Sequence, residues 1–225
     1  MKRLFLILIT IFLVNFFINP QAGLYAHEEE IQTTKEGIQY AVRFPEKFKE
    51  SESYPVLFCF HHRGDGVETT RIFSYAAYKL NWFIVGFKDI VFSDLDKETW
   101  PKVIKAQESV LKDVRNKYNV RNNRLYAAGF ANGATMAYDF AYRHPEKFRA
   151  IIAFGGGLGL DKPTYSVAVY QAVGEDDFNL DQVQRADSKL KVLGVKSQLR
   201  IFKGGYGWPP EEIVNEALEW ISRIK

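Results

Sequence analysis

Two glycines frame a position that, by its setting, could display a nucleophile. In the stretch LYAAGFANGATMAY, from Leu125 to Tyr138, Gly129 ends a predicted buried strand and Gly133 lies in the first turn of a predicted helix. Small residues at this spacing let a strand reverse sharply into a helix, and a serine at the centre of such a turn can attack a carbonyl carbon. The central residue here is Ala131, whose methyl group cannot act as a nucleophile. The sequence therefore combines a scaffold for nucleophilic catalysis with the loss of the nucleophile.

The elements that must position this turn alternate between strands and helices. Strands are expected at 37–44, 55–60, 81–87, 124–129, 149–154, 166–173 and 197–203, and helices at 69–80, 101–118, 132–143, 179–193 and 210–224. A continuous apolar run such as that at 55–60 is typical of a strand that is covered on both faces in a parallel sheet. The alternation predicts an α/β fold with a mainly parallel, doubly wound sheet flanked by helices. Any site is expected at the carboxyl ends of the strands.

Several short motifs resemble the α/β-hydrolase superfamily, particularly secreted esterases similar to polyhydroxyalkanoate depolymerases and feruloyl esterases, and the carboxylesterase/phospholipase group. GFANGA is similar to GFSNGG at the nucleophile turn, HHRGDG to the oxyanion loop, and GGYGWP to GGHxWP, while RHPEKF matches a helix end of the family. GEDD, at 174–177, follows a predicted strand as the family's acid-bearing motif does. The likeness spans about residues 37–224 in the chain order nucleophile, acid, base. It implies an α/β-hydrolase fold.

Position by position, the resemblance places the nucleophile at Ala131, the acid at Asp177 and the general base at Tyr206. Acyl transfer needs a base that takes the nucleophile's proton and returns it to the leaving group. A phenol with a pKa near 10 does this poorly at neutral pH. Two of the three implied triad positions therefore hold unsuitable residues. An engineered serine-to-alanine change would explain Ala131 but not Tyr206.

The resemblance also implies an oxyanion hole and a cleft. The backbone N–H groups of Asn132 and of the loop at His62 or Arg63 would donate to the oxyanion. His62 stands where the family has a glycine, so it is expected to alter or block this hole. Trp208, with Tyr206 and less strongly Trp100, is expected to line a cleft that stacks on sugar or phenolic rings.

The remaining histidines suggest a weaker hypothesis. His61 and His62, with Asp65 or Asp177, include ligand types that bind metal ions. Adjacent residues at a strand end are expected to point to opposite faces, so we predict a packed His61, a cleft-facing His62 and no metal site. His144 is predicted to mark a structural helix end. No cofactor is predicted.

The N-terminus has the pattern of a secretory signal peptide. Two basic residues precede an apolar run from Leu4 to Ile18, and the segment ends in Leu-Tyr-Ala. As a helix the run would extend about 22 Å, against a hydrocarbon core of about 30 Å, which favours cleavage near Ala26 over a retained N-terminal anchor. The expected organisation is a signal peptide at 1–26, a polar segment at 27–36 and one domain at 37–225. The product is expected to be secreted, or held in the periplasm or cell envelope, with no stable membrane span.

Composition and charge argue against a disordered or nucleic-acid-binding protein. The 225 residues are 47% hydrophobic and 25% charged, as in ordinary globular proteins. The net charge is +3, and loss of Lys2 and Arg3 would leave +1, so no nucleic-acid partner is predicted. Cys59 is the only cysteine and lies in an apolar run, which predicts a buried, inert thiol.

We interpret the sequence as an α/β-hydrolase homologue without a working triad, a pseudoenzyme, that retains a cleft for an ester, sugar or phenolic ligand or for a protein partner that the sequence does not identify. An active carboxylic-ester hydrolase with a non-standard site is the alternative. A purely structural envelope protein, which would bind no ligand, is a third.

Overall fold

The computed structural model describes residues 29–62, 65–88, 98–158, 163–164 and 166–225. Within these residues an eight-stranded sheet has the order β1-β2-β4-β3-β5-β6-β7-β8. The strands are β1 Glu30–Thr33, β2 Gln39–Arg43, β3 Tyr54–Phe60, β4 Phe83–Phe87, β5 Val120–Phe130, β6 Phe148–Phe154, β7 Ala168–Gly174 and β8 Ser197–Phe202. The helices are α1 Gly66–Ile72, α2 Ser74–Tyr78, α3 Trp100–Lys117, α4 Asn132–Arg143, α5 Leu180–Val192 and α6 Glu211–Ser222.

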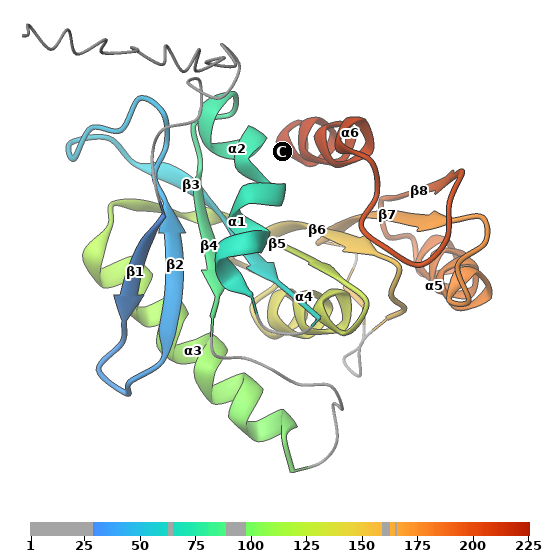
Figure 1. Ribbon diagram of the computed structural model, residues 1–225, viewed down its shortest axis with the longest axis horizontal. Coiled ribbons are helices and arrows are strands. Elements are labelled where there is room, and N and C mark those ends of the chain that lie inside the picture. Colours follow the sequence, from blue (N-terminus) through green and yellow to red (C-terminus); the bar gives the residue numbers. More distant parts are fainter. Residues whose placement is uncertain (1–28, 63–64, 89–97, 159–162, 165) are drawn as a thin grey trace, which may run out of the picture.

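The sheet is parallel from β4 to β8, and only its β1–β2 and β2–β4 pairings are antiparallel. Helices α3, α4 and α5 cover one face, and α1, α2 and α6 cover the other (Figure 1). This arrangement confirms the predicted mainly parallel α/β sheet of the α/β-hydrolase fold. No helix in the described ranges is long and apolar enough to cross a membrane.

Two local expectations were wrong or incomplete. The helix expected at 69–80 is divided at Phe73, which ends α1 and precedes α2. The Phe73 ring is fully buried and stacks on Phe154 at 6.1 Å, so its packing overrides local helical propensity. The polar segment at 27–36 contributes the edge strand β1, which its weak alternation did not predict.

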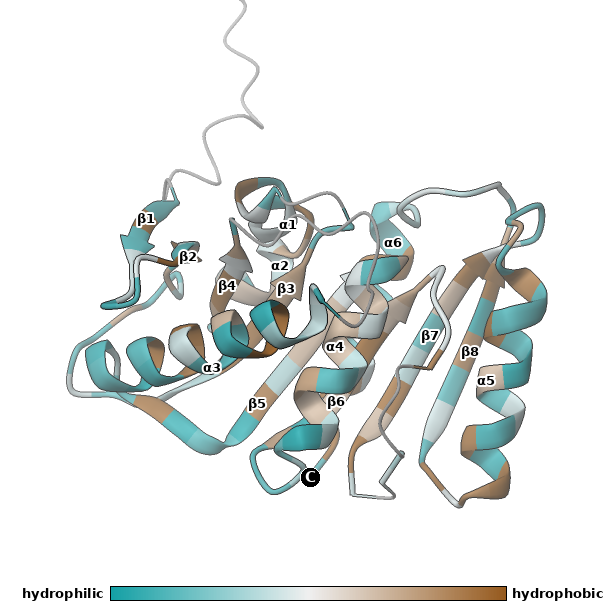
Figure 2. Ribbon diagram, turned by 90° about the horizontal axis from the view of Figure 1, so that it is seen from below, coloured by the Kyte–Doolittle hydropathy of each residue, from teal (hydrophilic) through white to brown (hydrophobic). Residues whose placement is uncertain are grey.

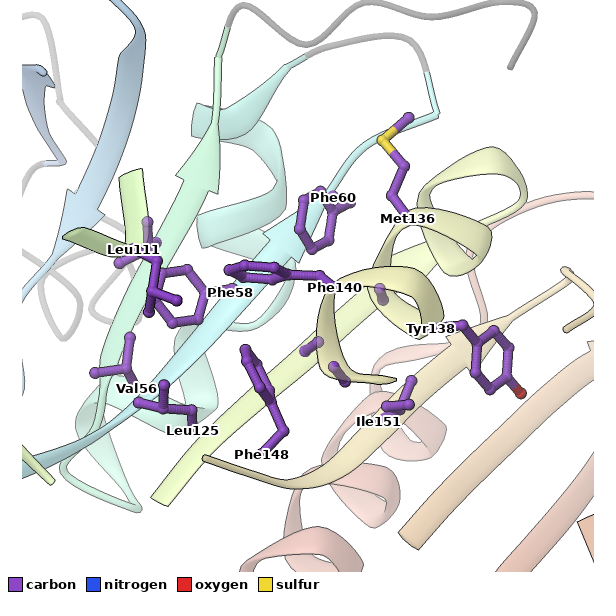
Figure 3. Packing of buried hydrophobic residues seen from close by; sticks show 14 of the residues in the cluster. Val56, Phe58, Phe60, Leu111, Leu125, Met136, Tyr138, Phe140, Phe148 and Ile151 are labelled. Atoms are coloured by element: carbon purple, nitrogen blue, oxygen red, sulfur yellow. The ribbon is translucent and has the colours of Figure 1, made fainter. Parts of the chain in front are cut away.

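Aromatic side chains hold α4 against the sheet. Phe140 lies edge-on to Phe58 at 5.3 Å and contacts Phe148 at 5.0 Å, which links α4 to β3 and β6 (Figure 3). Such aromatic contacts stabilise a core by more than the burial of their surface area alone would. Cys59, on strand β3, is also fully buried, and burial raises the pKa of its thiol, as expected for an inert cysteine. The aromatic contacts of Phe140 therefore pack α4, and with it the turn that precedes α4, against β3 and β6.

A polar network closes the far end of α4. His144, which caps the helix, lies with Nε2 2.7 Å from Oε1 of Glu108 on α3. Arg143 pairs with Asp139 and donates to Gln107. The histidine thus has the structural role that its place in RHPEKF predicted.

We expect this network to make stability depend on acid pH. The hydrogen bond from His144, opposed by partial burial and aided by the charges of His144 and Arg143, lowers the pKa of Glu108 below its ordinary 4.5. A carboxyl with a lowered folded-state pKa contributes stability above about pH 4.5, and this contribution is lost as the pH falls through the folded-state value. Urea unfolding between about pH 6 and pH 3 should therefore show a smaller acid-induced loss of stability in Glu108→Gln than in the parent. Equal losses in the two proteins would contradict the assignment.

Candidate functional site

The turn that joins β5 to α4 has the backbone expected for displaying a side chain. Ala131 is the N-cap of α4 and has φ 53° and ψ −118°, a conformation that is costly for a residue other than glycine. Its N–H donates to the carbonyl of Phe154 at 2.9 Å, which ties the turn to β6. The predicted strand-to-helix turn with strained backbone angles is confirmed. The side chain that it presents is only a methyl group.

The flanking glycines are required by close backbone approach. A Cβ at Gly129 would lie 2.2 Å from the carbonyl group of Gly133, and a Cβ at Gly133 would lie 2.2 Å from the carbonyl oxygen of Phe60. Real Cβ atoms essentially never come within 3.0 Å of backbone atoms, so neither position admits a larger residue without a backbone shift. The turn therefore packs closely against the end of β3. The implied oxyanion loop follows directly after that strand.

Asp177 follows β7 and lies near the turn. It is 5% exposed, and its Oδ1 accepts a hydrogen bond from the backbone N–H of Asn179 at 2.8 Å. Its Oδ2 is buried and has no hydrogen-bond partner within the described residues. A Cβ on Gly155, which follows the β6 residue bonded to Ala131, would lie 3.2 Å from Oδ2. The structure thus places a carboxylate oxygen beside the turn with unused capacity to accept a proton donor.

Tyr206 reaches the same edge of the sheet from the loop after β8. Its ring lies 4.9 Å from that of Phe130, the residue before Ala131, and is 44% exposed. The ring of Tyr206 also stacks on that of Phe178, with centroids 4.6 Å apart and planes inclined by 24°. The residues assigned to the acid and base positions are therefore brought to the turn by the ends of β7 and β8, and the phenol ring takes part in an exposed aromatic pair.

The two adjacent histidines correct one expectation. The rings of His61 and His62 stack with centroids 4.6 Å apart, so the side chains do not point to opposite faces. Strand β3 ends at Phe60, and the alternation of an extended strand does not continue beyond it. His61 is 9% exposed and its Nε2 lies 3.0 Å from Oε2 of Glu68. The His62 ring contacts Phe130 edge-on at 5.3 Å, which places it at the turn.

The other predicted site residues are only partly gathered here. Trp208 contacts Phe130 at 5.2 Å and lines a cavity of about 460 Å³ together with Tyr78 and Arg71. Trp100 packs against the core on the opposite face of the sheet, so it does not share a cleft with Trp208.

The oxyanion-hole residues and the hypothesis of a metal site remain to be compared with the structure. Asn132 is the first residue of α4, where the resemblance requires its N–H, whereas Arg63 lies outside the described residues. In the described part of the chain, no group of three or more histidine, cysteine, aspartate or glutamate side chains is arranged to hold a metal ion.

Sequence reasoning missed Phe178 and Glu68. Phe178 is 78% exposed and extends the aromatic surface of Tyr206. A lone aromatic residue in the otherwise polar loop GEDDFN was the available signal. Nothing in the sequence indicated that Glu68, on α1, would pair with His61.

Comparisons with known proteins agree with this fold. The model of the dienelactone hydrolase family matches residues 88–206, more than half of the chain. A structure described as a ferulic acid esterase is 20% identical, with a TM-score of 0.66, and the alignment covers 87% of this chain and 97% of that one. Esterase PE8 is 18% identical, with a TM-score of 0.64 and coverages of 82% and 97%. A bacterial heroin esterase is 13% identical, with a TM-score of 0.68 and coverages of 88% and 84%. At these identities the likeness shows the fold. None of the curated proteins compared matches the sequence significantly.

Proposed function

The chain belongs to the dienelactone hydrolase family, and from that premise we propose that it is a catalytically degenerate member whose cleft binds a ligand. The observation that supports this most directly is the contrast at Ala131. The costly positive φ of a nucleophile turn is retained, while the side chain is a methyl group that cannot attack a carbonyl carbon. Strain of this kind persists only where the surrounding structure maintains it.

The position of the base supports the same proposal. Tyr206 contacts Phe178 and Phe130 through its ring, and Asp177, the acid of the implied triad, keeps a buried oxygen without a partner in the described residues. In a working triad this oxygen accepts the Nδ1–H of the histidine and holds its tautomer. A phenol in an exposed stack does not replace that relay.

An active ester hydrolase with a non-standard site is the alternative, and one observation favours it. Nε2 of His61 lies 3.0 Å from Oε2 of Glu68, within the distance of an ion pair or hydrogen bond. The centroid of the His61 ring is 6.0 Å from that of Trp208. A histidine oriented by a carboxylate can act as a general base toward water. Such an enzyme would need neither Ala131 nor Tyr206 in a covalent role.

Two assays on the mature protein separate these functions. We expect no stoichiometric adduct with a serine-directed fluorophosphonate and no turnover of 4-nitrophenyl acetate above that of the heat-denatured protein, because loss of a triad nucleophile or base alone costs about 10⁶ in kcat. His61→Gln is the matched variant, since it keeps a polar side chain of similar length. Turnover by the parent that disappears in His61→Gln would establish the alternative, whereas a stoichiometric adduct would overturn the proposed degeneracy.

We further propose that residues 1–26 direct the chain out of the cytoplasm and are removed, leaving a domain that is secreted or held in the cell envelope. The short apolar run after two basic residues supports this proposal. N-terminal sequencing of the protein recovered from the host that expresses it should begin near His27. A protein that still starts at Met1 in the membrane fraction would indicate a retained anchor.

A further inference from the structure

We propose that the aromatic pair Phe178–Tyr206 binds a small ligand through an alkylated ammonium group. The inference deepens the proposed function, because it names the class of ligand for the retained cleft. Phe178 is 78% exposed and Tyr206 is 44% exposed, although both rings are large and apolar. Their centroids are 4.6 Å apart in a stacked arrangement, so the two rings form one continuous aromatic surface. The pair presents a preformed aromatic surface to solvent.

The pair lies at the edge of the sheet where the site is assembled. Phe178 precedes α5 in the loop after β7, and Tyr206 lies in the loop after β8, and the two parallel strands end at the same edge (Figure 2). Tyr206 also contacts Phe130 at 4.9 Å, next to the turn at Ala131. A ligand on the pair would therefore also be at the mouth of the implied cleft.

The charge around Phe178 is negative. The segment from Glu175 to Asp181 carries four carboxylates and no basic residue, and the side chains of Glu175, Asp176 and Asp181 are exposed. Asp177 is 5% exposed, and its Oδ2 has no hydrogen-bond partner among the described residues. A buried carboxylate oxygen without a partner is costly, and a nearby positive charge reduces that cost. The loop that carries Tyr206 begins with one basic residue, Lys203, so carboxylates outnumber basic residues around the aromatic pair.

The exposed aromatic pair and the surrounding carboxylates together favour a cation as the ligand. The face of an aromatic ring attracts an ammonium group, and adjacent carboxylates strengthen the attraction. A neutral sugar would stack on the rings and could donate hydrogen bonds from its hydroxyls to the carboxylates, but it would gain no charge attraction. A phenolate or a carboxylate would be repelled by them. An alkylated ammonium group, which is weakly hydrated and apolar at its surface, satisfies both the rings and the charge.

The probe that tests this is choline, compared with its neutral isostere 3,3-dimethylbutan-1-ol. In NMR titrations of the mature protein, we expect choline to bind at least about three times more tightly than the isostere, because only choline gains the cation–π and carboxylate attraction. Raising the salt concentration from about 20 mM to about 500 mM should weaken choline binding and leave the isostere unchanged.

Two variants locate the binding. Phe178→Leu keeps an apolar side chain but removes the ring, and we expect it to weaken choline binding about three- to fivefold without changing binding of the isostere. Asp176→Asn should weaken choline binding at low salt only. Since Phe178 is exposed, both proteins should fold, which the dispersion of their amide spectra checks.

Each outcome bears on the proposal. Equal binding of choline and its isostere, or choline binding that is unchanged in Phe178→Leu, would overturn it, as would no binding of choline at concentrations up to about 50 mM. These results are independent of the fluorophosphonate and ester assays. Choline binding with measurable turnover would leave the ligand class intact and remove the proposed degeneracy. If choline does not bind and no ester is turned over, the ammonium ligand would be ruled out and the proposed degeneracy would stand.

Discussion

Ala131→Ser combined with Tyr206→His should hydrolyse a short-chain nitrophenyl ester at least about 100-fold faster than the parent protein, a fraction of the roughly 10⁶ that a complete triad contributes. The serine would occupy the strained position that presents residue 131 at the end of β5. The imidazole at position 206 would find in Oδ2 of Asp177 a buried acceptor without a partner in the described residues. That acceptor is what a triad histidine needs in order to hold its tautomer and its charge.

The single variants are the controls for this gain of function. Ala131→Ser alone lacks a base for its proton, and Tyr206→His alone lacks a nucleophile, so each should remain within about threefold of the parent. Ala131→Ser with Tyr206→Phe is a matched pair of changes that keeps an aromatic ring but adds no imidazole. It should be inactive, and it should also resist the fluorophosphonate.

His62 decides whether a third change helps. Its ring lies 5.3 Å from Phe130 and 6.4 Å from Tyr206, beside the implied oxyanion loop. If the ring blocks the hole, adding His62→Gly to the active double variant should increase the rate further, because an oxyanion-hole donor contributes about 10²–10³ in kcat. A folded triple variant no faster than the parent would mean that the cleft has moved away from its ancestral geometry. The family membership would then describe the fold alone.

Gly133→Ala should destabilise the protein by at least about 3 kcal/mol, the upper part of the range for overpacking of a buried site. The added Cβ would lie 2.2 Å from the carbonyl oxygen of Phe60. That oxygen and the Cα that carries the Cβ both belong to backbone that is fixed by the sheet and by α4. Backbone cannot move aside as the end of a flexible side chain can. The measurement is the midpoint of urea unfolding followed by the fluorescence of the tryptophans.

Gly207→Ala provides the matched control. It changes glycine to the same residue in the loop between Tyr206 and Trp208, where an added Cβ meets nothing within 4 Å. We expect its stability to lie within about 0.5 kcal/mol of the parent. A comparable loss in both variants would contradict the clash with β3 as the cause, because the lower backbone entropy of an unfolded alanine variant by itself favours folding.

The fold and the turn could be predicted because both depend on local rules. Continuous apolar strands alternating with amphipathic helices indicate a parallel sheet, and β3, β5 and β6 follow that pattern closely. The glycine spacing around Ala131 is likewise a short sequence pattern, and at Gly129 the steric limit comes from Gly133, four residues further along the chain. Both features are visible in single segments of the chain.

The contents of the site depended instead on how loops and helices pack against the sheet. The break at Phe73 arises because its ring packs against Phe154, and the pairing of His61 with Glu68 requires α1 to fold back over the end of β3. The direction of a side chain beyond the end of a strand is set by the loop that carries it, so the stacking of His61 on His62 could not be read from alternation.

The sequence by itself determined the parallel strands of the sheet, the strained turn and the residue types at the three implied triad positions, since these follow from apolar periodicity, steric limits and chemical identity. Only the tertiary structure decided that Tyr206 stacks on Phe178 and that Asp177 keeps a buried oxygen without a partner in the described chain. The two loops concerned meet because β7 and β8 pair side by side. Contacts between loops depend on strand order, and strand order is a property of the whole sheet.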